Sequence, residues 1–152
     1  MKKIKNIITA IGNPILNNEL KKNKELNIIN NDIQYQEGVF ELLEKKHEID
    51  FIILSQLLPG ELDVDMFINK IIQINNKIKI IIILEKYNKN LENILINKGV
   101  YRIFYNEKIE IKDIIKLINE DEKMEKYNEE IRKEIEELKE LINNKKQKKI
   151  II

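Results

Sequence analysis

Cysteine and tryptophan are absent from this chain, and histidine occurs once, at His47. Without cysteine there can be no disulfides and no thiolate metal ligands, and one histidine cannot build a histidine metal site. No apolar run approaches the roughly 18 residues that a membrane-spanning helix requires. The apolar stretch at the N-terminus is too short for a signal peptide. We therefore expect a cytoplasmic protein with no membrane partner.

The composition is that of a globular domain. The chain has 152 residues, of which 43% are hydrophobic and 35% charged, with a net charge of +1. This length allows one domain with a sizeable core and leaves little for a second. A net charge close to zero, with no basic recognition helix, gives no indication of a nucleic-acid partner.

Short apolar runs alternate with amphipathic segments over the first 118 residues. A helix is expected to begin at Pro14, and Gly99 is expected to end the helix before the last strand. The alternation predicts right-handed βαβ units and an α/β fold with a parallel sheet covered on both faces. The expected strands are 4–11, 26–29, 51–54, 78–84 and 100–105, of which the isoleucine-rich fourth is the clearest buried strand.

The segment 49–60 reads IDFIILSQLLPG, a buried strand followed by a polar residue and a Pro-Gly turn. Together with Pro14, the isoleucine-rich fourth strand, and Gly99-Val100 before the fifth, it resembles the receiver domain of two-component response regulators. The resemblance covers about residues 3–118. It implies a CheY-like (flavodoxin-like) five-stranded parallel sheet of order 2-1-3-4-5, with a crevice between strands 1 and 3.

The resemblance also implies where a phosphorylation site would lie, and none of its groups is present. The positions of the acidic pair hold Ile11 and Gly12, and Ser55 replaces the aspartate nucleophile. Glu85 stands at the hydroxyl position and Asn106 at the lysine position. One carboxylate is a poor magnesium site, and serine is a weak nucleophile without a base. We expect a pseudo-receiver that is not an enzyme and binds no cofactor, and the alternative is a working receiver in a phosphorelay.

The predicted crevice has two interpretations, which the sequence leaves open. Asn13 and Gln56 join the degenerate pocket residues at the strand ends, where open α/β sheets bind small ligands. The interpretation as ordinary loop residues that end strands is favoured, because a polar strand end is expected in any such fold. The aromatic residues Tyr101, Phe104 and Tyr105 likewise fit either an interface or a partly filled core.

After residue 119 the sequence changes to a charged segment with a narrow apolar stripe. Two series seven residues apart, offset by four, form an a/d heptad pattern: Met124, Asn128, Ile131, Ile135, Leu138 and Ile142. The alternative is an amphipathic helix that covers its own domain, but such a helix usually shows a wider apolar face. The pattern therefore favours a dimerising or signal-transmitting coiled coil, with a homodimer as one expected assembly.

The expected layout is a receiver-like domain over 1–119, a coiled-coil helix over 120–144, and a linker over 145–152 that begins a downstream domain. This arrangement is similar to the pseudo-receiver arm that precedes the ATPase domain of MinD/ParA-like P-loop ATPases of the CpaE type. No Walker motif occurs in the chain. The sequence predicts a regulatory protein-interaction module whose partner is another protein or its own downstream domain, and a small-ligand sensor at the crevice is the alternative.

Overall fold

The computed structural model describes the backbone of residues 4–150, and the side chains of that range except those of 121–126, 128 and 146–150. The chain divides into two compact units, Met1–Ile111 and Lys112–Ile152. The sequence places the end of the first domain at residue 119, whereas the first compact unit ends at Ile111.

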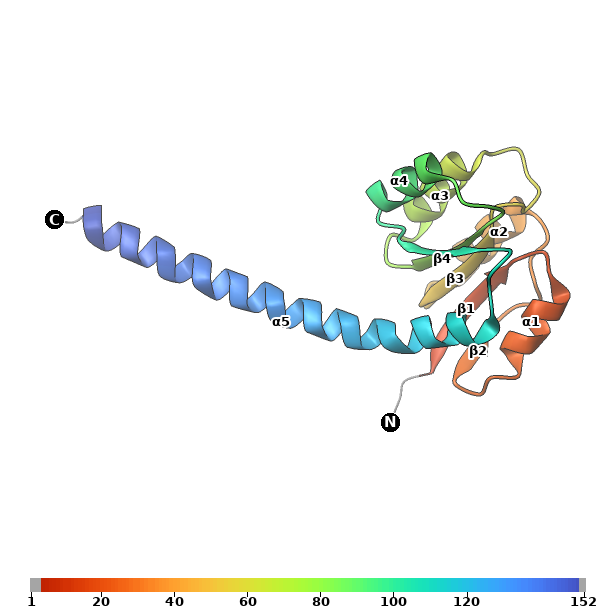
Figure 1. Cartoon of the computed structure of the whole chain (residues 1–152), viewed down its shortest axis with the longest axis horizontal. Coiled ribbons are helices and arrows are strands. Elements are labelled where there is room, and N and C mark those ends of the chain that lie inside the picture. The colour runs from red at the N-terminus through yellow and green to blue at the C-terminus, as the bar shows by residue number, and fades with distance from the viewer. Residues whose placement is uncertain (1–3, 151–152) are drawn as a thin grey trace. The chain divides into compact units, whose positions relative to one another are not determined.

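The first unit is an α/β domain (Figure 1). Its strands form one parallel sheet in the order β2-β1-β3-β4-β5, which confirms the predicted flavodoxin-like order. The elements in chain order are β1 (Lys5–Ala10), α1 (Pro14–Lys21), β2 (Leu26–Ile28), α2 (Gln36–Lys45), β3 (Phe51–Ser55), α3 (Val64–Ile74), β4 (Lys79–Leu84), α4 (Lys89–Asn97) and β5 (Arg102–Tyr105).

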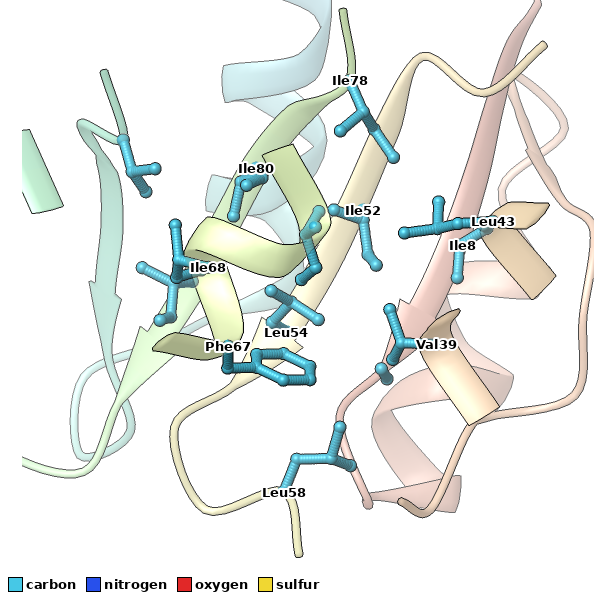
Figure 2. Packing of buried hydrophobic residues seen from close by; sticks show 14 of the residues in the cluster. Ile8, Val39, Leu43, Ile52, Leu54, Leu58, Phe67, Ile68, Ile78 and Ile80 are labelled. Carbon is cyan, nitrogen blue, oxygen red and sulfur yellow. The ribbon is translucent and has the colours of Figure 1, made fainter. Parts of the chain in front are cut away.

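The core lies against the two central strands, β3 and β4. Every residue from Phe51 to Leu54 is fully buried, and so is nearly every side chain from Ile80 to Leu84. Continuous burial is typical of strands covered on both faces of a parallel sheet. Figure 2 shows one of these layers, in which Ile52 and Leu54 lie among side chains of α2 and α3.

The helix ends follow the capping rules that the sequence suggested. The Asn13 side chain accepts a hydrogen bond from Leu16 N at 3.2 Å, with Pro14 in the first turn of α1. Gly99, after α4, has a φ of 86°, a conformation that glycine adopts without strain. Val100 N then donates to Leu95 O at 2.8 Å, which completes a helix-ending turn. The predicted role of Gly99 is confirmed.

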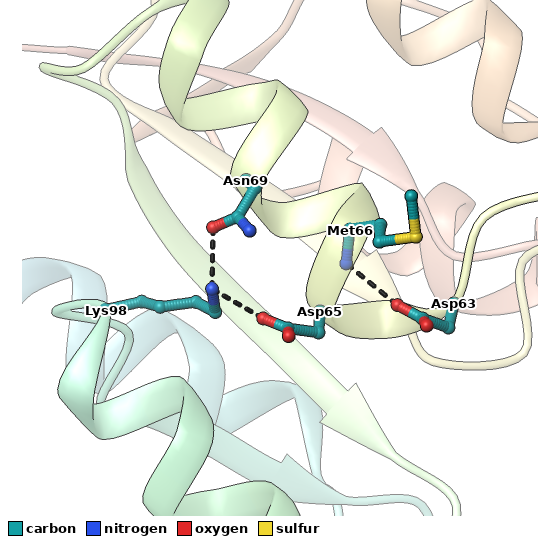
Figure 3. A network of polar contacts seen from close by, with 5 residues as sticks. All are labelled: Asp63, Asp65, Met66, Asn69 and Lys98. Atoms are coloured by element: carbon teal, nitrogen blue, oxygen red, sulfur yellow. Dashed lines mark hydrogen bonds and ion pairs between the residues drawn. The ribbon is translucent and has the colours of Figure 1, made fainter.

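A polar contact joins α3 to the end of α4 (Figure 3). The ammonium of Lys98 donates to Asn69 Oδ1 at 2.6 Å and lies 2.5 Å from Asp65 Oδ1. That carboxylate oxygen is buried and accepts no hydrogen bond of normal geometry among the described residues. The lysine charge therefore compensates for its burial.

The second unit consists of the helix α5 (Ile111–Ile150), which starts at the last residue of the first unit. Residues 145–150 of the predicted linker continue the helix α5, and their role as a linker stays a prediction. Lysine and glutamine are good helix formers, and neither glycine nor proline follows Gly99. Residues 151–152, the expected start of a downstream strand, lie outside the described residues. No helix in the described part is both long and apolar enough to cross a membrane.

The apolar side chains of α5 differ along its length. Ile114 and Ile118 are fully buried, whereas Ile135, Leu138 and Ile142 are exposed. Ile131 is partly covered. The side chains of the two other predicted seam residues, Met124 and Asn128, lie outside the described residues.

Candidate functional site

A cavity of about 870 Å³ opens at the carboxyl ends of the central strands. It lies at the point between β1 and β3 where the strand order reverses, which is the usual ligand site of open α/β sheets. Its lining comes from the ends of β3 and β4, from the segments that follow β1, β3 and β5, and from the loop before α2. The residues are Ile11, Gly12, Asn13, Ile15, Leu16, Gln34, Tyr35, Ser55, Leu57, Leu58, Pro59, Ile83, Asn106, Ile109, Glu110 and Ile111.

Three predicted site residues reach this cavity from the turn between β1 and α1. Ile11 directly follows β1, Gly12 turns the chain with a φ of 69°, and Asn13 caps α1. The positive φ suits glycine, so an acidic side chain at this position would sit on strained backbone. The backbone conformation therefore explains the glycine at this turn without reference to metal binding.

Two more predicted residues line the cavity from β3 and β5. Ser55 is the last residue of β3, and its hydroxyl accepts a hydrogen bond from Leu57 N at 3.1 Å. Asn106 follows β5, and its backbone N–H donates to Leu84 O at 2.8 Å. The structure thus brings Ile11, Gly12, Asn13, Ser55 and Asn106 around one cavity.

Glu85 and Gln56 do not line the cavity; they join the ends of neighbouring strands instead. The Gln56 side chain accepts a hydrogen bond from Glu85 N at 2.9 Å, and Gln56 N donates to Ile83 O at 2.9 Å. The Glu85 side chain is exposed. In this arrangement Gln56 holds the end of β3 to the end of β4.

Sequence reasoning missed Asp32, which lies in the loop after β2. One of its carboxylate oxygens accepts a hydrogen bond from Ile11 N at 2.8 Å, and the other accepts one from Asn13 N at 2.9 Å. The nearby Asn30 side chain holds Thr9 in the same way, accepting from its N–H at 3.0 Å and donating to its carbonyl at 2.9 Å. The only signal was the polar run Asn30-Asn31-Asp32, which the sequence explains equally well as a strand end.

The residues present do not fit the magnesium ion that a working receiver binds. Both oxygens of Asp32 already accept backbone hydrogen bonds, and Glu110 is the one carboxylate among the described residues that line the cavity. No group of three or more metal-binding side chains occurs in the described part of the chain. Mg²⁺ requires several hard oxygen ligands, with carboxylates prominent among them.

The cavity is instead mostly aliphatic. Isoleucine, leucine and proline supply nine of the lining residues, and the exposed side chains of Ile15, Tyr35 and Leu57 stand on its rim. The polar groups are amides, hydroxyls and Glu110, and no lysine or arginine is among the described lining residues. Such a lining suits neutral, apolar groups.

Ser55 also lacks the partner that a nucleophilic serine needs. Among the described residues, its hydroxyl is hydrogen-bonded only to the backbone N–H of Leu57. A serine hydroxyl becomes a nucleophile when an adjacent base removes its proton. The side chain here closes a local turn after β3.

Two further ionisable residues, Asp50 and His47, do not line the cavity. Asp50 precedes β3, at the opposite edge of the sheet, and accepts a hydrogen bond from Asn6 N at 2.8 Å. His47 is exposed.

The aromatic residues of the last strand region differ in their exposure. Tyr101 is exposed and Phe104 is partly buried. Tyr105 is half-buried, and its hydroxyl is hydrogen-bonded to Glu92. Burial, followed by the hydrogen bond to Glu92 and its negative charge, raises the pKa of Tyr105 to about 12.

No family model matches this sequence, and no curated protein matches it. Solved structures match the fold. The RcsB response regulator of Salmonella typhimurium superposes with a TM-score of 0.69 and 18% identity, covering 81% of this chain and 61% of RcsB. A CheY-like receiver domain protein from Methanospirillum hungatei JF-1 gives 0.66 and 14%, covering 82% and 99%. The fold is that of a receiver domain.

One further response-regulator structure agrees with that assignment. A LuxR-family DNA-binding response regulator from Staphylococcus aureus matches with a TM-score of 0.64 and 18% identity, covering 76% of this chain and 97% of the other. Identities this low establish the receiver fold and not an activity. The chain spans less than two thirds of the RcsB response regulator, whose receiver domain makes up only part of that protein.

Proposed function

We propose that this chain is a non-phosphorylatable pseudo-receiver that acts as a regulatory protein-interaction and dimerisation module in the cytoplasm, without enzymatic activity. The observation that carries the proposal is the cavity at the carboxyl ends of β1 and β3. Its lining includes Ile11, Gly12, Ser55 and Asn106. The receiver resemblance assigns these residues to the positions of the acidic pair, the nucleophile and the lysine.

Electrostatics supports this proposal. Phosphoryl transfer proceeds when cations neutralise the charge on the phosphoryl oxygens. Here the lysine position carries the neutral amide of Asn106, and the lining contributes the carboxylate of Glu110. A phosphoryl group placed in this cavity would meet aliphatic carbon and neutral amides, and no lysine or arginine among the described lining residues would offset its charge.

The test is phosphorylation by a small donor. The full chain is incubated with Mg²⁺ and acetyl phosphate, and its intact mass is measured, with a receiver that retains its aspartate as the positive control. We expect no phosphoryl adduct on the parent. Ser55→Asp restores the carboxylate alone and should also stay unlabelled, because the acidic pair and the lysine are still missing. A Mg²⁺-dependent adduct on the parent chain would support the alternative, a receiver that works in a phosphorelay.

The interaction role rests on the helix α5. Its apolar side chains Ile135, Leu138 and Ile142 are exposed at heptad spacing, and a face of this kind is stable in water when another helix covers it. We expect light scattering to give the parent a dimeric mass and the double variant Ile131→Lys/Leu138→Lys a monomeric one. Glu137→Lys/Glu140→Lys adds the same two lysines outside the stripe and should remain dimeric. If Ile131→Lys/Leu138→Lys keeps the mass of a dimeric parent, α5 is not the interface.

The partner we propose is a protein, either a separate one or a domain that follows in the same chain. RcsB has been solved bound to promoter DNA and is longer than the part that this chain matches. The near-neutral charge of this chain favours a protein partner over nucleic acid. The coding sequence after Ile152 tests the version with a P-loop ATPase, which requires a glycine-rich loop ending in Gly-Lys-Thr or Gly-Lys-Ser.

A second candidate function is a sensor for a small neutral ligand, favoured by the size and the aliphatic lining of the cavity. A ligand that binds only the folded state raises the melting temperature. A medium-chain alcohol is a suitable probe, since it offers an apolar chain and one hydroxyl. We expect it to raise the melting temperature of the parent more than that of Leu57→Asp, which places a charge on the rim. Equal shifts for both proteins would argue against a site in this cavity.

A further inference from the structure

The charged residues beside the exposed stripe of α5 form a pattern of their own. With Ile131 and Leu138 at d positions, and Ile135 and Ile142 at a positions, the flanking e positions hold Arg132 and Lys139. The flanking g positions hold Glu134 and Leu141. All four flanking side chains are exposed in the single chain, so they are available to a second helix. In coiled coils these positions set partner choice and orientation.

A parallel pairing of two copies makes use of these charges. In a parallel two-stranded coil, a g residue faces the next e residue of the other helix. Glu134 then faces Lys139 of the second copy, and the two-fold symmetry of a homodimer creates that contact twice. Leu141, at the following g position, extends the apolar seam, and its side chain is also exposed.

An antiparallel pairing places like charges together. There, e positions face e positions and g positions face g positions. The basic Arg132 and Lys139 lie against basic side chains, and Glu134 faces either its own copy or Leu141. Like charges in this arrangement are destabilising. The sequence adds that Asn128, at an a position, meets Asn128 of the other copy only in a parallel, in-register coil, where the two amides satisfy each other.

We propose that residues 128–142 of α5 pair with the same residues of a second copy of this chain as a parallel, in-register two-stranded coiled coil. The proposal rests on the homodimer proposed above and specifies its orientation and register. In a parallel pairing the N-terminal ends of the two paired segments lie together, and so do their C-terminal ends.

The absence of cysteine allows a direct test in the full chain. Leu138→Cys places one thiol at a d position, where a parallel in-register coil brings the two copies of the residue together. We expect mild oxidation to convert this variant to a disulfide-linked dimer. Glu140→Cys, at an outward f position, should stay largely uncrosslinked under the same conditions and serves as the matched control.

The outcomes separate this proposal from the homodimer itself. A parent that is dimeric by light scattering, with no crosslink through Leu138→Cys, would overturn the parallel register and leave the homodimer standing. A monomeric parent would overturn both. Equal crosslinking of Leu138→Cys and Glu140→Cys would indicate random collision and would also overturn the register.

Charge reversal provides a second measurement that does not depend on disulfide formation. Glu134→Lys and Lys139→Glu should each raise the dissociation constant of the dimer by roughly tenfold, since each turns two attractive pairs into repulsive ones. The double variant Glu134→Lys/Lys139→Glu restores opposite charges and should return the constant close to that of the parent. Additive losses in the double variant would mean that these two residues do not face each other.

Discussion

The two units of this chain place the same residue types in opposite surroundings. In the α/β unit, Ile8, Ile52 and Leu54 are fully buried, whereas on α5 the side chains of Ile135 and Leu138 are 46% and 58% exposed. Burying an aliphatic side chain of this size contributes about 1.5–3 kcal/mol. The α/β unit gains that free energy when it folds, and the distal part of α5 gains it only when another surface covers it.

This difference in exposure separates the residues that maintain the fold from those that remain available for contact with another molecule. In the α/β unit, buried apolar residues and internally bonded polar groups maintain a receiver fold, even at the cavity where receiver chemistry would occur. On α5 the apolar stripe and its flanking charges are of little use to a single chain. Under the proposed function, the α/β unit is the folded scaffold and α5 is the segment that contacts a partner.

The largest expected difference between the two units comes from the same substitution, leucine to alanine, made once in each of them. Leu54→Ala removes a fully buried side chain from β3 and should lower the free energy of unfolding by about 2–5 kcal/mol. Leu138→Ala makes the same change on the exposed stripe and should alter it by less than about 0.5 kcal/mol in the monomer. Urea unfolding at a protein concentration below the dimer dissociation constant measures both. A large loss for Leu138→Ala in the monomer would show that this side chain packs within its own chain.

The fold was predictable because its strands carry the signal themselves. A run such as 79–84, with lysine followed by four isoleucines and leucine, has few structural uses other than a buried parallel strand. The positions of Ile11, Gly12, Ser55 and Asn106 around one cavity followed from the same topology, because the carboxyl ends of neighbouring parallel strands meet.

What the sequence could not supply were contacts between distant loops. Nothing in the run Asn30-Asn31-Asp32 shows that the Asp32 carboxylate accepts hydrogen bonds from the turn after β1. The sequence also predicted Glu85 as a pocket residue, whereas its side chain is exposed and does not line the cavity. The length of α5 was also missed. The asparagines at 143–144 suggested an end to the helix, but the lysine-rich residues that follow them favour helix too.

A smaller effect tests whether the α/β unit satisfies its polar groups internally, as the comparison requires. Asp32→Ala leaves the N–H groups of Ile11 and Asn13 without their acceptors and should cost about 1–3 kcal/mol. Asp32→Asn keeps one oxygen and should cost less than the alanine variant. Chemical denaturation gives both values. If neither variant loses stability, water replaces the carboxylate, and the hydrogen bonds from Asp32 to Ile11 and Asn13 contribute little to the free energy of unfolding.

Removing one ion pair from each unit should give a smaller difference in the free energy of unfolding. Lys98→Met removes the charge beside the buried oxygen of Asp65 and should cost about 1 kcal/mol. Adding Asp65→Asn should recover part of that loss, because no carboxylate is then left uncompensated. On α5 the matched change is Lys116→Met, which removes an exposed pair with Glu120 at 4.0 Å and should have almost no effect. Equal losses for both lysines would contradict the distinction between the units.

The smallest expected effect is a change in the free energy of unfolding of the α/β unit that appears only at high pH. The pKa of Tyr105 is raised to about 12 by burial, by its hydrogen bond to Glu92 and by the charge of that carboxylate, against about 10 in an unfolded chain. Between those values the unfolded chain has lost the phenol proton and the folded chain retains it. Raising the pH therefore favours unfolding, and the contribution present below pH 10 is lost as the pH passes through 12.

Tyr105→Phe should remove this part of the pH dependence, and Glu92→Gln should reduce it, because the glutamine no longer carries the charge that raises the Tyr105 pKa. The measurement is the free energy of unfolding from pH 9 to pH 12, for the parent and both variants, with tyrosinate absorbance as an independent record of deprotonation. A parent curve that falls no more steeply than that of Tyr105→Phe would show that Tyr105 titrates as an exposed phenol, and that its contact with Glu92 does not hold α4 to β5 in solution.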